Sequence, residues 1–177
     1  MNVVLIGYRG TGKTTVARLL ATRLGLTAID ADDLIEAAAG CTIREIFDTG
    51  GEGRFRDLEQ RVLSELAGSQ GIVLAAGGGA ILREANRRIL STLGNVVWLT
   101  ADVETILART RGDQSTASRR PNLTVAGGRD EVARLLAERE PLYRGCADEI
   151  VETSGRSPDE VADKIEQHLQ NTGKPGS

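Results

Sequence analysis

The segment Gly7–Thr14 (GYRGTGKT) has glycine, lysine and threonine in the spacing G-x-x-x-x-G-K-T, which suits phosphate binding. Glycines let successive backbone N–H groups turn toward an anion, and a helix that begins there adds partial positive charge. Lys13 can then reach the β- and γ-phosphates of a nucleotide, and the Thr14 hydroxyl can ligate Mg²⁺. A glycine-rich turn with a chance lysine is the alternative, but a strand pattern precedes the segment and a helical pattern follows it. The residues predicted to bind the phosphates are Gly10, Thr11, Gly12, Lys13, Thr14 and Thr15.

A carboxylate near Mg²⁺ is expected from the second strand. The strand pattern at 71–76 runs into Gly77–Gly79 instead of ending in an aspartate. Asp30 and Asp32 follow the second strand pattern, and they could serve Mg²⁺ through water or accept hydrogen bonds from substrate hydroxyls. Aspartates are equally common there as helix N-caps, and the pattern alone does not separate the two interpretations. Asp33 is assigned to the first turn of the helix.

Arg56 and Arg139 are candidates for binding a carboxylate, because a planar guanidinium matches two oxygens at once. Glu59, one helical turn beyond Arg56, could keep that guanidinium in place. By spacing alone, Arg56 or its neighbour Arg54 could be a surface residue, and exposure is the default for Arg139. The three glycines at 77–79 follow a buried strand pattern, which favours close approach of bare backbone to a ligand over a flexible turn.

Short apolar runs predict the strands that position these residues. Three of the runs are β-branched and continuous, as is typical of strands buried on both faces of a parallel sheet, and two weaker candidates join them. The five ranges are 2–6, 71–76, 95–100, 26–30 and 149–153.

Helical patterns lie between the strands, after the first strand and again over 54–67. Thr42 with Glu45 predicts a capping box before a short helix, and Ser157 with Glu160 predicts the start of the last helix. Strand alternates with helix throughout, which predicts an α/β fold, a three-layer α/β/α sandwich around a five-stranded parallel sheet. With the phosphate motif, this is the P-loop NTPase type with a lid.

The length of 177 residues fits a single domain, which we place at 1–170. The stretch at 111–128 is polar and lacks periodicity, and we predict that it is a lid. A flexible tail is predicted at 171–177, where Gly, Pro and Ser are frequent.

Composition argues against several classes of function. No run of eighteen apolar residues is available for a membrane span, and no basic region precedes the first apolar run, so we expect neither membrane association nor a signal peptide. A net charge of −3 and 3% aromatic residues argue against nucleic-acid binding.

Cys41 and Cys146 form no CxxC pair and are interpreted as reduced thiols of a cytoplasmic enzyme. His168, the only histidine, is predicted to be a surface residue, so no catalytic triad or His-rich metal site is expected.

Together these motifs resemble the shikimate kinase family across nearly the whole chain. The phosphate loop is general to P-loop proteins, but the combination and its order are specific. The shared motifs are the loop at 7–14, D-x-D at Asp30 and Asp32, Phe55-Arg56 with Glu59, Gly77-Gly78-Gly79, Arg120-Pro121, and Arg139 with Pro141-Leu142-Tyr143-Arg144. The resemblance implies transfer of the γ-phosphoryl group of ATP, with Mg²⁺, to the 3-hydroxyl of shikimate. The products would be shikimate 3-phosphate and ADP, on the route to chorismate and the aromatic amino acids.

The resemblance also implies a role for each matching position. Asp30 would lie near Mg²⁺, through water, and near the attacking hydroxyl, although whether it is a true base stays open. Lys13 and Arg120, the latter from the lid, would stabilise the transferring group. The implied shikimate-binding residues are Asp32, Arg56, Gly78, Gly79 and Arg139. The implied adenine site consists of Arg109 and the loop from Arg156 to Pro158.

One departure concerns the lid, where Asn122-Leu123 follows Arg-Pro in place of the usual two leucines, and where 113–119 is long. Arg119 could therefore serve instead of Arg120.

Two alternative functions stay open: another small-metabolite P-loop kinase, such as a gluconate or nucleoside monophosphate kinase, and a catalytically silent nucleotide-binding module. The first would need no arginine clamp for a carboxylate. We expect a monomer whose partners are ATP and shikimate.

Overall fold

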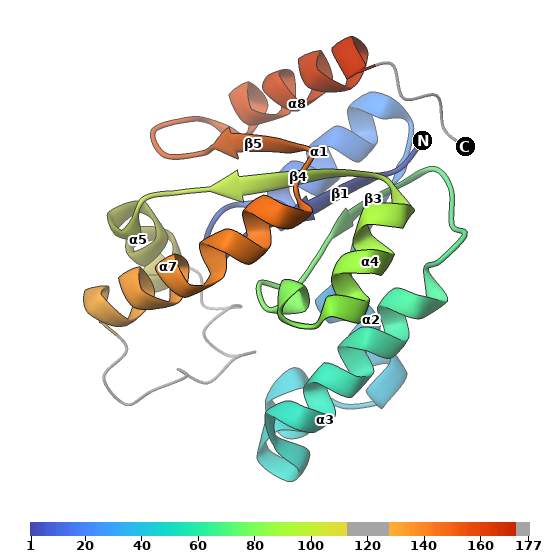
Figure 1. Ribbon diagram of the computed structural model, residues 1–177, viewed down its shortest axis with the longest axis vertical. Helices are drawn as coiled ribbons and strands as arrows, with labels where there is room; N and C mark the ends of the chain where they lie inside the picture. The colour runs from blue at the N-terminus through green and yellow to red at the C-terminus, as the bar shows by residue number, and fades with distance from the viewer. Residues whose placement is uncertain (113–127, 173–177) are drawn as a thin grey trace.

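A parallel sheet with the strand order β2-β3-β1-β4-β5 lies at the centre of the molecule (Figure 1). The structure, a computed structural model, describes residues 1–112 and 128–172. The strands are β1 (Val3–Ile6), β2 (Thr27–Asp30), β3 (Ile72–Ala75), β4 (Asn95–Thr100) and β5 (Glu149–Glu152). All pairings are parallel, so all five predicted strands are confirmed, including the two weaker ones.

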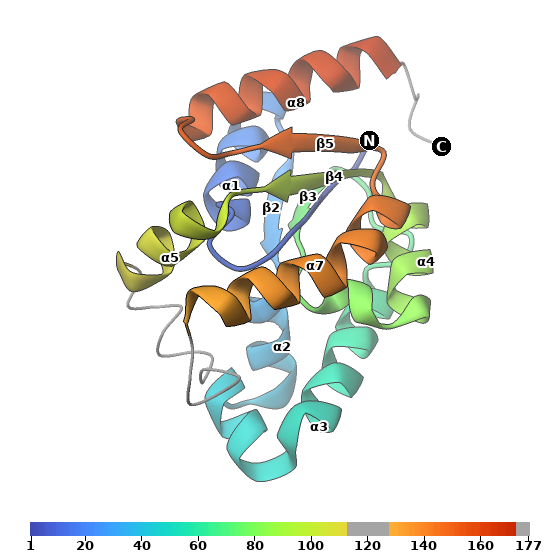
Figure 2. The ribbon, with the colours of Figure 1, turned by 60° about the vertical axis from the view of Figure 1, so that its left-hand side comes forward.

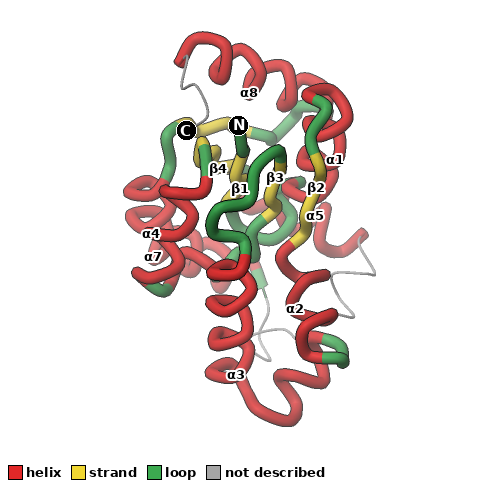
Figure 3. Tube along the Cα trace, turned by 90° about the vertical axis from the view of Figure 1, so that its right-hand side faces the viewer, coloured by secondary structure: helices red, strands yellow, loops and turns green. Residues whose placement is uncertain are grey.

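Helices cover both faces of the sheet. The described helices are α1 (Lys13–Leu24), α2 (Ala31–Ala39), α3 (Ile43–Glu65), the 3₁₀ turn η1 (Ala80–Leu82), α4 (Glu84–Leu93), α5 (Val103–Gly112), α7 (Arg129–Cys146) and α8 (Pro158–Thr172). Figure 3 shows α1 and α8 on one side of the strands, and α4 and α7 on the other. The predicted three-layer sandwich is therefore confirmed.

The continuous apolar runs of the strands follow from this layering. Val3 and Leu5 of β1 belong to the apolar cluster beneath α1 and α8, whereas Val4 and Ile6 belong to the cluster beneath α4 and α7. Successive side chains of a strand point to opposite faces, and here both faces are covered. An alternating polar pattern is therefore absent from β1, which lies between β3 and β4.

Helices α2 and α3 project beyond the sheet and form a small apolar cluster of their own (Figure 2). The predicted capping box is confirmed, because the Glu45 N–H donates to Thr42 Oγ1 at 3.2 Å and the Thr42 N–H donates to Glu45 Oε2 at 2.8 Å. The two helices expected at this point form a single assigned helix, interrupted by Gly51, whose φ is 67°. A left-handed φ suits glycine, which explains the change of direction there.

Several predicted boundaries need correction or fall outside the described residues. The tail was placed two residues too early, since α8 extends to Thr172. Of the predicted lid at 111–128, residues 111 and 112 end α5, Gly128 is the N-cap of α7, and 113–127 lie outside the described residues. None of the helices described has the length and apolar content required to cross a bilayer.

The prediction for His168 was wrong. Its side chain is only 16% exposed, and its Nδ1 lies 3.1 Å from Glu149 Oε2 at the start of β5. Helix α8 packs its apolar face against the sheet through Val161 and Ile165, and this packing brings His168 against the strand end. The leucine beside His168 gave no signal of this contact, because Glu149 is distant in the sequence.

Candidate active site

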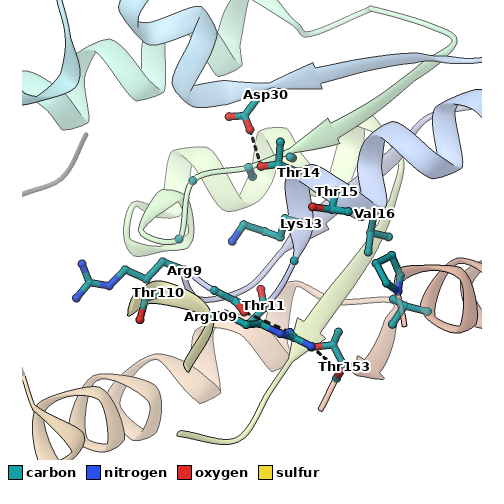
Figure 4. A pocket seen from close by; sticks show the side chains of 18 of the residues that line it. Arg9, Thr11, Lys13, Thr14, Thr15, Val16, Asp30, Arg109, Thr110 and Thr153 are labelled. Atoms are coloured by element: carbon teal, nitrogen blue, oxygen red, sulfur yellow. Dashed lines mark hydrogen bonds between the residues drawn. The ribbon is translucent and has the colours of Figure 1, made fainter. Parts of the chain in front are cut away.

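A cavity of about 530 Å³ opens where the strands of the sheet end (Figure 4). Ligands in open parallel sheets bind at the carboxyl ends of the strands, and this cavity lies there. Its lining comes from the P-loop after β1, from Asp30 and Asp32 after β2, from 75–78 after β3, from Arg109 and Thr110 of α5, and from Thr153 after β5. All six predicted phosphate-binding residues line it.

The P-loop conformation depends on its glycines. Gly7, Gly10 and Gly12 all have positive φ, at 142°, 79° and 91°. At Gly7 an added Cβ would lie 2.3 Å from the Leu99 carbonyl oxygen, so no larger residue fits without moving β4. Gly12 is the N-cap of α1, which directs the N–H groups of the first turn into the cavity.

Lys13 lies over the P-loop. Its Nζ donates to the carbonyl oxygens of Gly7 and Tyr8, at 2.8 and 2.9 Å. These are neutral acceptors at the base of the cavity, and Figure 4 shows the side chain extending along the loop. A lysine in this position is set to meet phosphate oxygens rather than apolar core.

Asp30 is a helix N-cap, as one of the two interpretations expected, and it also contacts the P-loop. Its Oδ1 accepts a hydrogen bond from the Asp32 N–H at 2.9 Å, which caps α2, and its Oδ2 accepts from Thr14 Oγ1 at 2.7 Å. The cap fixes the carboxylate, and the second oxygen faces the P-loop. Asp33 is exposed in the first turn of α2, as predicted.

The pair formed by Thr14 and Asp30 fits a magnesium ion. Mg²⁺ prefers oxygen ligands and is usually bound in kinases by one or two protein oxygens together with phosphates and water. A hydroxyl and a carboxylate oxygen meet here at the mouth of the phosphate loop. Within the described ranges no cluster of three or more His, Cys, Asp or Glu gathers around a single point, and a magnesium site of this kind needs none.

The side of the cavity predicted to bind adenine is formed by α5 and the β5–α8 loop. Arg109 donates to Thr153 Oγ1 and to the Thr153 carbonyl oxygen, both at 2.9 Å, and Arg156 donates to the Glu152 carbonyl oxygen at 2.6 Å. Arg109, Arg156 and Pro158 all line the cavity, so the structure brings the three predicted residues together.

Arg56 is fixed by a buried ion pair rather than exposed. Its Nη1 lies 2.5 Å from Glu59 Oε2, and the Glu59 side chain is 0% exposed. Its Nε lies 3.2 Å from Glu52 Oε1, which is on the surface, and its Cζ is 4.8 Å from the centroid of the Phe55 ring. The neighbouring Arg54 is exposed and hydrogen-bonds Thr49. The choice between Arg56 and Arg54 as the buried arginine is therefore settled.

Arg56 and Arg139 both lie against the glycine loop. A Cβ added at Gly79 would be 2.4 Å from Arg56 Nη2 and 2.7 Å from its Cζ. Arg139 Nη1 donates to the Gly78 carbonyl oxygen at 3.4 Å, and the Tyr143 hydroxyl donates to the same oxygen at 2.5 Å. Glycine at 79 thus leaves room for the Arg56 guanidinium. The residues that line the main cavity include Gly78 and Asp32 but neither arginine.

Several residues of the site were missed. Arg9 and Thr110 line the cavity, Thr153 orients Arg109, and Tyr143 fixes Gly78. Tyr143 belongs to a motif already noted, and Thr153 ends a predicted strand, so both carried a signal. Arg9 stands at a variable position of the phosphate motif and had none. The candidate lid arginines Arg119 and Arg120 lie outside the described residues.

Comparison with known proteins agrees with this arrangement. A profile of the protein family described as shikimate kinase matches residues 9–170. The shikimate kinase of Rhodopirellula baltica is 47% identical over 164 residues, which cover 93% of this chain and 88% of the relative. The solved shikimate kinase from Acinetobacter baumannii, in complex with shikimate, is 40% identical with a TM-score of 0.90, covering 98% of this chain and 95% of that one. The solved shikimate kinase from Aquifex aeolicus is 30% identical with a TM-score of 0.79, covering 99% and 100%. The chain therefore belongs to the shikimate kinase family.

Proposed function

We propose that the protein transfers the γ-phosphoryl group of ATP to the 3-hydroxyl of shikimate, giving shikimate 3-phosphate and ADP. The observation that carries the proposal is the meeting of two half-sites at one edge of the sheet. One is the P-loop cavity with Thr14 and Asp30, and the other is the glycine loop at 77–79 with Arg56 and Arg139 against it. Membership of the shikimate kinase family supports this acceptor over others.

The nucleotide half binds ATP through the P-loop. Backbone N–H groups from Gly10 to Thr15 and the N-terminus of α1 attract the phosphates, and Lys13 exchanges its carbonyl partners for phosphate oxygens. Arg109 and the loop at 156–158 enclose the adenine. Thr14 and, through water, Asp30 would hold Mg²⁺, which would neutralise charge on the β- and γ-phosphates when bound.

The acceptor half binds shikimate through its carboxylate. Arg56 and Arg139 each offer a planar fork to the two oxygens, and burial makes such paired contacts stronger than those on an open surface. Glu59 orients Arg56 and thereby fixes the distance between the two forks. Asp32, at the start of α2, accepts hydrogen bonds from the ring hydroxyls, and the bare backbone of Gly78 and Gly79 lets the ring approach closely.

In the transfer step, the 3-hydroxyl oxygen forms a bond to the γ-phosphorus while the bond to the bridging oxygen of ADP breaks. Asp30 orients the hydroxyl or accepts its proton. Lys13, with the lid arginine Arg120, stabilises charge on the transferring group. Exclusion of water from the cavity prevents hydrolysis of ATP as a competing reaction. We further propose that the protein is cytoplasmic, which is consistent with its two free cysteines. We also propose that it acts as a monomer.

An acceptor screen tests the proposal. ADP release would be followed by a coupled assay with MgATP and, in turn, shikimate, gluconate, a nucleoside monophosphate and no acceptor. We expect turnover with shikimate alone, and its loss in Lys13→Met without a change in melting temperature. Turnover with gluconate or a nucleotide but not shikimate would identify another small-metabolite kinase. Nucleotide binding without turnover on any acceptor would identify a silent nucleotide-binding module.

A further inference from the structure

Arg9, a P-loop residue between Tyr8 and Gly10, is a cation for which the proposed function gives no role. It lines the cavity and is half-buried, and its Cζ lies 5.8 Å from the centroid of the Tyr8 ring. No carboxylate within 1–112 or 128–172 lies at ion-pair distance from it. A half-buried guanidinium in a ligand cavity normally meets an anion, because removing it from water is costly unless it is paired.

The backbone places Arg9 between the two half-sites. Lys13 Nζ, the amine that reaches the γ-phosphate, lies 2.9 Å from the Tyr8 carbonyl oxygen, and the next residue is Arg9. On its other side, a Cβ added at Gly78 would lie 3.3 Å from the Arg9 nitrogen. The Arg9 side chain therefore leaves the loop where the phosphate half meets the acceptor half. Figure 4 shows it beside Thr110, at the end of the cavity away from Thr153.

The Tyr8 ring links Arg9 to the acceptor clamp. Tyr8 is 2% exposed and packs with Ile106 and Val132, so the ring is fixed. Arg139 also lies over this ring, with its Cζ 5.6 Å from the centroid. Like Arg9, Arg139 makes no ion pair with a carboxylate in the described part of the chain. Two cations that share one ring repel each other, and an anion between them and Lys13 would relieve that repulsion.

We propose that Arg9 contacts the phosphoryl group while it passes from ATP to the acceptor, which makes it a further catalytic residue. The inference rests on the proposed function. In the transfer, the bond from the γ-phosphorus to the bridging oxygen breaks as the bond to the hydroxyl oxygen forms, and charge spreads over the three equatorial oxygens. Arg9 gives up no proton. It donates hydrogen bonds to one of these equatorial oxygens, and this contact is stronger during transfer than in bound ATP because the charge has spread onto them.

The test compares Arg9→Met, which keeps most of the side-chain length and removes the charge, with Arg9→Lys and with the control Arg134→Met. Arg134 is an exposed residue of α7 paired with Glu138 on the surface. We expect kcat to fall about 10- to 100-fold in Arg9→Met. This loss is smaller than that expected for a fully enclosed arginine, because solvent screens the charge of Arg9. The KM values for ATP and shikimate, the calorimetric affinity for MgADP and the melting temperature should match wild type. Arg9→Lys should recover part of the loss, and Arg134→Met should match wild type.

An unchanged kcat in Arg9→Met would overturn the proposal. So would a raised KM for shikimate at normal kcat, since that would make Arg9 a third arm of the carboxylate clamp. If Arg9→Met does not fold, Arg9→Lys is used for the test, because an ammonium lacks the planar fork. A full wild-type kcat in Arg9→Lys would contradict the proposal, and a reduced kcat with normal KM would support it. A wild-type protein that does not phosphorylate shikimate would refute the proposed function itself, which is seen before any variant is made.

Discussion

At the scale of single residues, the candidate site contains side chains that are held in place by hydrogen bonds and ion pairs within the protein. Asp30 caps α2 with one oxygen and meets Thr14 with the other. Glu59 is fully buried beside Arg56, so that each charge compensates the other and the loss of either would leave a buried charge uncompensated. These contacts fix the candidate functional groups before a ligand binds. Substitutions at these positions should therefore affect substrate binding selectively where the fold survives.

Truncation of the clamp should impair shikimate turnover strongly. Removing one partner of a desolvated, hydrogen-bonded charge pair costs about 2–5 kcal/mol. Arg139→Ala should thus lower kcat/KM for shikimate about thirty- to several-thousand-fold, since each 1.4 kcal/mol is about tenfold. Arg139→Lys should also fail, because an ammonium cannot make the planar two-point contact. Steady-state kinetics measure this, with little change expected in the affinity for ATP.

The control for the clamp is Arg54→Ala, on the same helix as Arg56 and exposed. It should behave like wild type, whereas Arg56→Ala should resemble Arg139→Ala. Near-normal kcat/KM in Arg139→Ala would mean that the carboxylate is bound elsewhere, and would reopen the identity of the acceptor.

Glu59 should act as a positioning residue for Arg56. Glu59→Gln keeps the shape of the side chain but removes its charge, so Arg56 loses its fixed partner at 2.5 Å. We expect the KM for shikimate to rise about tenfold, the worth of one charged hydrogen bond, while the KM for ATP stays the same. The matched control is Glu52→Gln, which removes the exposed partner of the same guanidinium. Equal behaviour of the two variants in steady-state kinetics would show that burial of Glu59 has no part in binding.

At the scale of secondary-structure elements, sequence patterns predicted the features that depend on residues close together in the chain. The Ser157 cap of α8 is confirmed, with the Glu160 N–H donating to Ser157 Oγ at 3.2 Å and the Ser157 N–H donating to Glu160 Oε2 at 2.7 Å. The strands were evident because both faces of the sheet are covered. Gly51 could not be predicted as a change of direction inside one helix, and the burial of His168 depends on Glu149, a partner distant in the sequence.

The Ser157 cap should make stability depend on pH through Glu160. The backbone N–H of Ser157, and then its hydroxyl, lower the pKa of the Glu160 carboxyl below its ordinary value of 4.5. A carboxyl whose pKa is lowered on folding stabilises the folded state above the unfolded pKa, and this contribution is lost as pH falls through the folded value. Glu160→Gln should therefore melt at a lower temperature than wild type at pH 7, and the difference should shrink below pH 4.5.

Two further variants check the cap by thermal unfolding. Ser157→Ala should lose about 1 kcal/mol, the usual cost of removing a serine N-cap. Glu138→Gln, in an exposed pair on α7, is the control and should melt at about the wild-type temperature at pH 7. A difference between Glu160→Gln and wild type that persists unchanged in acid would mean that the charge of Glu160 is not the cause.

At the scale of the whole molecule, the parallel topology brings distant segments to one edge of the sheet. The P-loop, the end of β2, the glycine loop and the end of β5 all line the same cavity. The chain has a net charge of −3, yet cations from five different segments surround the site. They are Arg9, Lys13, Arg56, Arg109, Arg139 and Arg156. This concentration of positive charge suits the two anionic ligands, ATP and a carboxylic acid.

Sequence motifs predicted most of this convergence because strand ends in such a sheet share one edge. They did not predict which residues lie against the glycine loop. At Gly79 the Arg56 guanidinium occupies the space that a side chain would need, and at Gly78 an added Cβ would come within 3.3 Å of the Arg9 nitrogen, while the Tyr143 hydroxyl donates to the Gly78 carbonyl oxygen. These contacts join residues far apart in sequence, and no local pattern records them.

The most direct test of the account is whether the enzyme recognises the acceptor through its carboxylate. The measurement is kcat/KM for shikimate and for shikimate carboxamide, a neutral analogue of the same shape, in wild type and in Arg139→Ala. We predict that wild type prefers shikimate by at least about a hundredfold, because the amide has no negative charge and offers the two guanidinium groups only one acceptor oxygen. The preference should fall by at least about tenfold, one lost charge contact, in Arg139→Ala. Equal use of acid and amide by wild type, or a preference that Arg139→Ala leaves intact, would contradict the account.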